Sequence, residues 1–429
     1  MTATALTQQA KRAYTRVVNA WCLYDWGNSA FSTTVEAAVL PVYFARVAGS
    51  QLGGNTATVY WGYAAAISLL VSALLAPLLG SIADYTGKKK RLLGLFAGLG
   101  IVTTALLFSV EQGDWLRALI LVSLGSLGFA GAAIFYDSLL PHVAKPEDMD
   151  FVSSKGYALG YLGGGLLLAV NILMIQLLPG TLGARLSFLS VAVWWAVFTI
   201  PLLRLVPEPA ANTRGIGQGV NPLTAGFRRL GQTFGEMRRY RQLFFFLMAF
   251  WLYNDGIGTI IKMATIYGAE IGIGDTSLIG ALLMTQFVGI PFSLLFGKMS
   301  KRLGTKRSIM LGLGWYTLIA IAGYFISQAW HFWVLAFAVG MVQGGTQALS
   351  RSLFGVMAPR ARSAEFFGFY DGLCGKASAV VGPTVYGLIA GFTNQRFAVL
   401  FIGLFFLAGL IILRGVREPE RKSTASSHS

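Results

Sequence analysis

The sequence predicts an all-α membrane protein in which twelve transmembrane helices form two six-helix bundles. Hydrophobic residues make up 55% of the 429-residue chain and charged residues only 12%, whereas about a quarter of the residues of soluble domains are charged. Apolar runs of about 20 residues, the length that crosses a bilayer, recur roughly every 30 to 35 residues. We expect helices at 19–45, 58–82, 92–110, 116–140, 153–178, 186–205, 243–268, 277–297, 308–327, 332–354, 365–390 and 396–414.

The distribution of the 34 basic residues predicts the orientation of these helices. Lys262 and Lys376 fall within expected spans, and nearly all the others lie on one side of the membrane. The loops of the opposite side hold only Arg46, Arg117, Arg185 and Arg396. Because basic loops stay in the cytoplasm, both termini are expected there. The net charge of +16 is therefore explained by topology in a bilayer, which we expect to be a bacterial inner membrane, and nucleic acid is not an expected partner.

The longest expected loop divides the chain into two equal sets of helices. We predict an N-terminal bundle at 1–206, a cytoplasmic linker at 207–242, a C-terminal bundle at 243–415 and a disordered tail at 416–429. The linker is rich in glycine and arginine, which is typical of a connection between domains. The expected functional unit is a monomer.

The two halves repeat one another in sequence. Gly80, Asp84 and Gly87 precede a basic run after the second expected helix, and Gly297 and Gly304 precede another after the eighth. The fifth and eleventh helices also share one glycine spacing, at positions 156, 160 and 163 and at positions 368, 372 and 375. Such matched landmarks indicate a parallel repeat, with two bundles that enclose a central cavity.

The pattern Gly80-x-x-x-Asp84-x-x-Gly87-Lys-Lys-Lys-Arg91 resembles the signature between helices 2 and 3 of the major facilitator superfamily. The second copy departs from this pattern, because Lys301 stands where an acid is expected. The segments 24–31 (YDWGNSAF) and 347–352 (QALSRS) resemble the branch that contains the fungal autophagy-related vacuolar amino-acid effluxers and their bacterial relatives. The resemblance implies transport of an amino acid and a cavity lined by helices 1, 4, 7 and 10.

Polar side chains follow single faces of several expected helices. Asp25, Ser29, Ser32 and Glu36 lie within about 60° of one another on the first helix. Asp255, Thr259 and Lys262 form the equivalent stripe on the seventh helix, and Gln343 and Gln347 lie on the tenth. Since a charged group at the bilayer centre costs about 2.5 to 3.5 kcal/mol, such stripes indicate a wet cavity. The candidate solute- or proton-binding residues are Asp25, Asn28, Ser29, Ser32, Glu36, Asp255, Thr259, Lys262, Gln343, Gln347, Asp371 and Lys376.

Acidic and basic groups around one cavity suit a zwitterion, because carboxylates bind an ammonium group and a lysine binds a carboxylate. An amino acid or small peptide is therefore the expected solute, although the same charges also suit a purely structural network. Protons are the expected coupling partner, with Asp25, Asp255 and Asp371 as the first carriers. Sodium coupling stays open.

A second group of residues is expected to gate the pathway. Asp84 pairs with Arg91 or caps the start of a neighbouring helix, and either contact holds the bundles closed at the cytoplasmic side. Gly80 and Gly87 permit close approach and a tight turn. Asp137 and Arg351, at the cytoplasmic ends of two helices, are expected to form a second clasp.

The sequence lacks the residues that other functional classes require. Only three histidines occur, and they are scattered, so neither an enzyme site nor a metal or cofactor site is expected. No Gly-x-x-x-x-Gly-Lys-Ser/Thr loop for nucleotides is present. The leading hypothesis is a secondary carrier, working as a symporter or an effluxer, and the alternative is a non-transporting sensor or receptor on the same fold.

Overall fold

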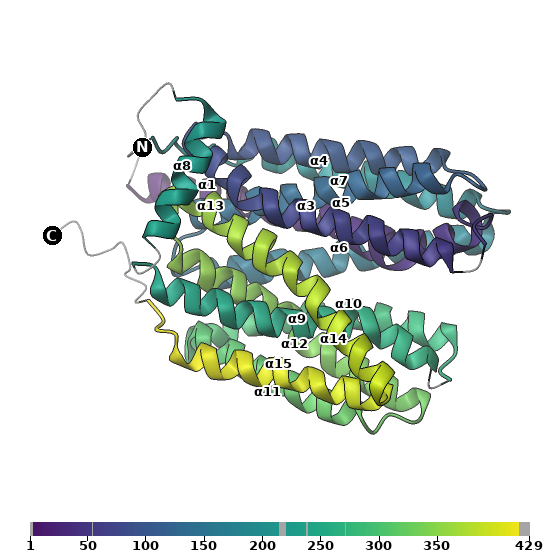
Figure 1. Cartoon of the computed structure of the whole chain (residues 1–429). Helices are drawn as coiled ribbons and strands as arrows, with labels where there is room; N and C mark the ends of the chain where they lie inside the picture. The colour runs from purple at the N-terminus through teal and green to yellow at the C-terminus, as the bar shows by residue number, and fades with distance from the viewer. Residues whose placement is uncertain (1–2, 54, 214–219, 237–238, 271, 420–429) are drawn as a thin grey trace.

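The computed structural model describes residues 3–53, 55–213, 220–236, 239–270 and 272–419, and in these parts of the chain it contains helices and no strands. Long helices run side by side in two groups, with the N-terminal half in one and the C-terminal half in the other (Figure 1). The last residues of the predicted disordered tail, 420–429, lie outside the described chain.

The N-terminal half begins with one helical segment that changes its winding. Regular α1 passes into a π-helical stretch, η1, just where Ser32 and Glu36 lie, and Pro41 then opens the short α2. The elements are α1 (Ala3–Ala30), η1 (Phe31–Val39), α2 (Leu40–Tyr43), η2 (Phe44–Ala48), α3 (Thr56–Thr86), α4 (Lys89–Leu106), η3 (Leu107–Ser109), α5 (Trp115–Val143), α6 (Met149–Leu177) and α7 (Leu182–Leu205).

The linker between the halves contains a helix, α8 (Pro222–Gly235), that the sequence interpretation did not anticipate. A π-helical stretch, η5, divides the expected helix at 365–390 into α13 and α14. The remaining elements are α9 (Arg241–Glu270), α10 (Asp275–Leu303), α11 (Thr305–Gly323), α12 (Ala329–Met357), η4 (Arg360–Arg362), α13 (Ser363–Phe367), η5 (Gly368–Cys374), α14 (Gly375–Phe392) and α15 (Gln395–Gly415).

Within the described residues, nine helices are long and apolar enough to cross a membrane. They correspond to α3, α4, α5, α6, α7, α9, α10, α12 and α15. Their lipid-exposed residues are large and apolar, such as Ile67 and Leu74 on α3 and Ile411 on α15. Such exposure is stable in hydrocarbon and costly in water. The chain is therefore an integral membrane protein.

Buried side chains form one large cluster in each half. The first joins residues between Val18 and Val206, and the second joins residues between Leu243 and Val416. Ala364, at the start of α13, is the exception, because it packs into the cluster of the N-terminal half. The start of α1, the end of α15, α8 and α13 lie at one end of the molecule (Figure 1). We call it the gated end, after the predicted gating residues Gly80 and Asp84, which contact α13.

At the gated end the two halves touch through glycines. A Cβ atom on Gly80 of α3 would overlap the Ala364 carbonyl group, and a Cβ on Gly297 of α10 would lie 2.8 Å from the Cβ of Ser154 on α6. The structure thus brings the equivalent glycines of the two repeat copies against the opposite half. Gly87 adopts φ +64°, a conformation that favours glycine, where the loop after α3 turns.

Candidate transport pathway and gate

A buried polar group between the halves is the Arg351 cluster, which consists of Arg351, Asp25, Asp137, Tyr136 and Ser153. The Arg351 guanidinium on α12 bonds the Asp137 carboxylate of α5 at 2.9 Å and the Asp25 carboxylate of α1 at 3.3 Å. It also donates to the hydroxyl of Ser153 on α6 at 2.8 Å and to its carbonyl at 2.9 Å. One side chain of the C-terminal half thereby holds three helices of the other half together.

Aromatic rings enclose the same guanidinium. The Tyr136 hydroxyl donates to Asp25 at 2.7 Å, and the rings of Trp21, Tyr136 and Tyr157 lie 4.5 to 5.5 Å from the guanidinium carbon. Such rings stabilise a cation through their negative faces. Only 3% of the Arg351 side chain is exposed. Each carboxylate therefore keeps its ionic partner in a region of low dielectric, where an unpaired charge is costly.

A third carboxyl group lies beside this cluster. Asp371 of η5 interacts with Asp137 and, more weakly, with Arg351. Its Oδ2 atom is buried and has no hydrogen-bond partner among the described residues. Three acids, Asp25, Asp137 and Asp371, therefore lie around the Arg351 guanidinium, which leaves two more carboxyl groups than guanidinium charges. Such a group can take up further positive charge, as protons or as an ammonium group.

Farther from the gated end, charged side chains of both halves face one space. Glu36 of η1 accepts a hydrogen bond from Ser126 of α5 at 2.9 Å, and its charge acts on Lys262 of α9. Lys376 of α14 acts on Lys262 as well, and its ammonium group lies 5.9 Å from the Phe129 ring of α5. Glu36 and Lys262 are both exposed. Because charges from opposite halves interact there, these side chains line the space between the bundles.

Two predicted site residues on α9 have partners within their own half. The Asp255 carboxylate accepts a hydrogen bond from the backbone N–H of Gly382 on α14 at 2.7 Å, and the Thr259 hydroxyl donates to the Asp255 carbonyl at 2.7 Å. Both side chains are buried. A Cβ on Gly382 would overlap both of them. This part of the α9 stripe therefore holds α14 in place, and only Lys262 reaches the space between the halves.

The other predicted cavity residues also divide between packing and the central space. Ser29 lies against Gly160 of α6, Ser32 donates to the Ser29 carbonyl at 3.0 Å, and the buried Asn28 lies beside Tyr24. On α12, the partly exposed Gln343 interacts with Tyr161 of the opposite half. Gln347, one turn closer to Arg351, is partly exposed as well.

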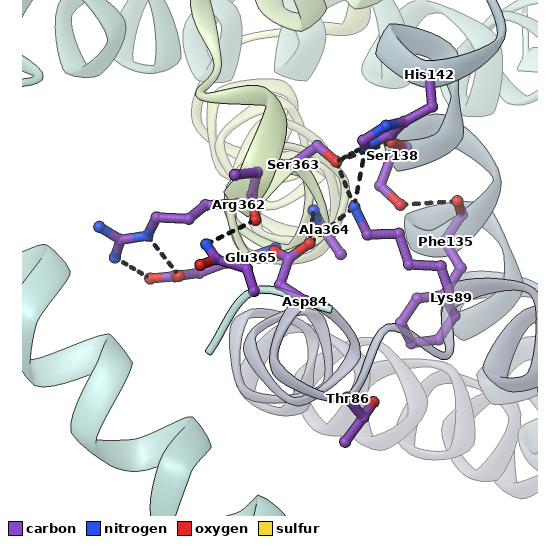
Figure 2. A network of polar contacts seen from close by, with 12 residues as sticks. Asp84, Thr86, Lys89, Phe135, Ser138, His142, Arg362, Ser363, Ala364 and Glu365 are labelled. Carbon is purple, nitrogen blue, oxygen red and sulfur yellow. Dashed lines mark hydrogen bonds and ion pairs between the residues drawn. The ribbon is translucent and has the colours of Figure 1, made fainter. Parts of the chain in front are cut away.

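A second contact between the halves is built on Asp84. Its carboxylate forms an ion pair of 2.8 Å with Lys89 and accepts hydrogen bonds from the backbone N–H groups of Glu365, at 2.8 Å, and Ala364, at 3.3 Å (Figure 2). Asp84 thus caps α13, as one of its two predicted roles requires. Its ionic partner is Lys89 rather than Arg91, which is exposed. We call Asp84, Lys89 and Ser363, with the first turn of α13, the Asp84 latch.

Hydroxyl and imidazole groups complete this latch. The Lys89 ammonium donates to the Ser363 hydroxyl at 2.6 Å, and Ser363 donates to the Ser138 carbonyl of α5 at 2.9 Å. The His142 ring lies 3.3 Å from Lys89 and 3.2 Å from Ser363 (Figure 2). Lys89 and Asp84 expose 3% and 0% of their side chains. A buried pair of this kind exists only while α13 lies on α3 and α5.

The linker helix α8 contacts the outer side of the latch. Arg362 bonds Glu365 at 3.0 Å and Glu236, just beyond α8, at 3.3 Å. Burial disfavours the charge of the Arg362 guanidinium, but the bond to Glu365 outweighs it, so the pKa of Arg362 is raised. Thr233 of α8 donates to the Glu365 carboxylate. The described part of the linker therefore packs against the latch.

The second repeat copy forms an inverted version of the latch. Lys301, which replaces the acid, lies over the Phe151 ring of α6. The acid comes from the other side instead: Asp150 of α6 accepts hydrogen bonds from Thr305 of α11, at 2.7 Å, and from Ser352 of α12. Helices of the C-terminal half thus provide the hydroxyls, and the start of α6 provides the carboxylate.

Several residues of this site escaped the sequence reasoning. Tyr136 directly precedes the predicted Asp137, and Lys89 lies in the basic run of the motif, in which Arg91 was the expected partner of Asp84. Asp150 stands at a helix start, where an acid is ordinary. Only the repeat, which lacks its acid at Lys301, gave a signal that a partner had to come from elsewhere.

Comparisons with known proteins identify the class of this fold. The human organic anion transporter MFSD10 superposes with a TM-score of 0.73 at 12% identity, covering 93% of this chain and 99% of that one. The proton:xylose symporter XylE of the major facilitator superfamily superposes with a TM-score of 0.68 at 15% identity and 96% coverage of both chains. The fold is that of a major facilitator transporter.

The particular family follows from sequence. The family model described as "Vacuole effluxer Atg22 like" matches residues 54–426. The chain is 38% identical to the uncharacterised MFS-type transporter YxiO of Bacillus subtilis, over 96% of this chain and 97% of that one. It is 25% identical to autophagy-related protein 22-2 of Aspergillus oryzae, over 84% and 73%. The chain belongs to the Atg22-like family, and the predicted resemblance is confirmed. This family consists of membrane transporters and not of enzymes.

Proposed function

We propose that the protein is a secondary active transporter that moves a small polar solute, an amino acid or small peptide, by alternating access coupled to protons. The observation that carries the proposal is the Arg351 cluster, in which one buried cation of the C-terminal half shares two carboxylates of the N-terminal half. A competing cation can break an ion pair that is shared in this way. A proton or an ammonium group that binds Asp25 weakens its hold on Arg351, which frees the halves to move.

In this proposal twelve helices cross the bilayer, the moving bodies are residues 1–206 and 243–415, and the gated end faces the cytoplasm of a bacterial cell. The basic loops lie at that end, and α1, α11 and the α13–α14 segment are the three further spans. The Asp84 latch and the Asp150 contacts then close the cytoplasmic side, while Glu36, Lys262 and Lys376 are reached from outside.

The charges suggest how a zwitterion would be held. Lys262 and Lys376 attract the carboxylate of the solute, and its ammonium group lies toward the acids around Arg351. Glu36 also attracts Lys262, so a bound carboxylate competes with Glu36 for this ammonium group. Charge-assisted hydrogen bonds of this type are roughly twice as strong as neutral ones.

Counterflow in proteoliposomes tests the proposal. Vesicles loaded with a mixture of unlabelled amino acids are diluted into each labelled amino acid in turn, with sugars and organic anions as comparison sets. Transient accumulation of a labelled amino acid, faster when a proton gradient is imposed, is the expected result. Saturable binding without any counterflow would identify a receptor and overturn the carrier proposal.

A further inference from the structure

Helix α8 presents two different faces. Ala225, Gly226 and Thr233 are buried against α3 and the latch. On the opposite side, Leu223 and Phe227 expose 57% and 63% of their surface. Packing among the described residues does not account for these two large apolar side chains one turn apart on a linker helix.

The exposed face is itself divided along its length. With Leu223 at zero on the helical wheel, Phe227 lies at about 40° and the partly buried Leu230 at about −20°, whereas Thr224 and Arg228 lie at about 100° and 140°. One edge of the face is therefore apolar and the other is polar. This division is typical of a helix that lies in the plane of a membrane surface.

The position of α8 agrees with such a role. Ile67, Leu70 and Leu74 form the lipid-exposed stripe of α3, with 60%, 60% and 65% of their surface exposed. The same face continues to Leu78 and Ile82, which lie within about 80° of Ile67 on the helical wheel. A Cβ on Gly226 of α8 would lie 2.9 Å from both of these side chains.

Thus α8 covers α3 at the place where the lipid-facing stripe ends. It runs across the ends of the long helices and not along them (Figure 1). A helix in this position has the bilayer on one side and the solvent on the other.

We infer that α8 is an interfacial helix whose Leu223 and Phe227 enter the headgroup and acyl boundary of the surrounding phospholipid bilayer, with Arg228 among the headgroups. Because Thr233 and Glu236 at the other end of the helix region bind Glu365 and Arg362, anchoring in lipid holds the linker against the latch. Contact with the bilayer thereby stabilises the closed state of the latch, a role separate from solute transport.

Spin labels test the inference without any knowledge of the solute. In full-length protein with Cys22 and Cys374 replaced by serine, Phe227→Cys and Gln232→Cys carry the label in vesicles of phosphatidylcholine and phosphatidylglycerol. Gln232 is exposed on the polar edge of the same helix. At position 227 we expect the spin label to collide more with oxygen than with a water-soluble nickel chelate. At position 232 we expect it to collide more with the chelate.

Three results would overturn the inference. A label at 227 that collides mainly with the chelate would place the edge in water, and a label there shielded from both reagents would indicate a protein partner. As a second measurement, Phe227→Glu should open the gate while Gln232→Glu, with the same added charge, should not. Equal gate opening in these two variants would also contradict it.

Discussion

Replacing Asp84 by asparagine should open the gated end. Asparagine keeps the size of the side chain and one acceptor oxygen, but it leaves the Lys89 ammonium buried without its 2.8 Å partner. Removing one member of a buried ion pair costs about 3–5 kcal/mol. This cost falls on the closed state alone, because Lys89 regains water when α13 leaves α3.

A destabilisation of about 3 kcal/mol lowers the ratio of closed to open molecules by roughly a hundredfold. Spin labels at Lys145→Cys on the N-terminal half and Arg360→Cys on the C-terminal half, both exposed positions, report that ratio through their distance distribution. In Asp84→Asn the longer distance should become the dominant population.

The matched control is Glu147→Gln, which removes the same charge from an exposed position at the same end. It should leave the distribution unchanged. If Asp84→Asn gave the distribution of the unmodified protein, or if Glu147→Gln opened the gate equally, the reasoning from buried charge would be refuted.

Further substitutions test the other contacts. Gly80→Ala places a Cβ on the Ala364 carbonyl group and should open the gate, whereas Gly98→Ala, with open space around its Cβ, should not; equal label distances in the two variants would argue against close helix contact as the cause. Asp150→Asn should also open the gate, since it removes the charge to which Thr305 and Ser352 donate hydrogen bonds. An unchanged distance distribution would show that the inverted latch does not stabilise the closed state. Asp25→Asn should abolish proton-linked flux while expression is retained, and full proton-linked flux would exclude Asp25 from coupling. Asp255→Ala should lower stability in detergent by about 1.5–3 kcal/mol, because the Gly382 N–H loses a charged acceptor, whereas Asp255→Asn keeps an acceptor and should lower stability less; equal melting temperatures in the two variants would contradict this role.

Sequence reasoning reached the major facilitator fold because lipid imposes simple rules on composition. Apolar length, the sorting of lysines and arginines and the repeated glycine loops all depend on local sequence. The signature around Asp84 and the clasp between Asp137 and Arg351 were predicted because helix ends that share a side of the membrane can meet.

The remaining contacts depend on helix rotation, which sequence periodicity does not fix to within one residue. Asp255 and Lys262 share a stripe, yet one turns to α14 and the other to the space between the halves. The π-helical turns of η1 and η5 shift the register beside Glu36 and Asp371. Helix α8 was missed because its apolar residues are few and stand among glycines and arginines.

Reciprocal distances at the two ends of the molecule test the central claim most directly. The gated end is measured with the labels at 145 and 360, and the opposite end with labels at Thr58→Cys and Thr393→Cys, both in lipid vesicles. Alternating access predicts that Asp84→Asn lengthens the first distance and shortens the second in the same molecules. A distance at the opposite end that stays constant while the gate opens would contradict a carrier whose two halves rock about the Arg351 cluster.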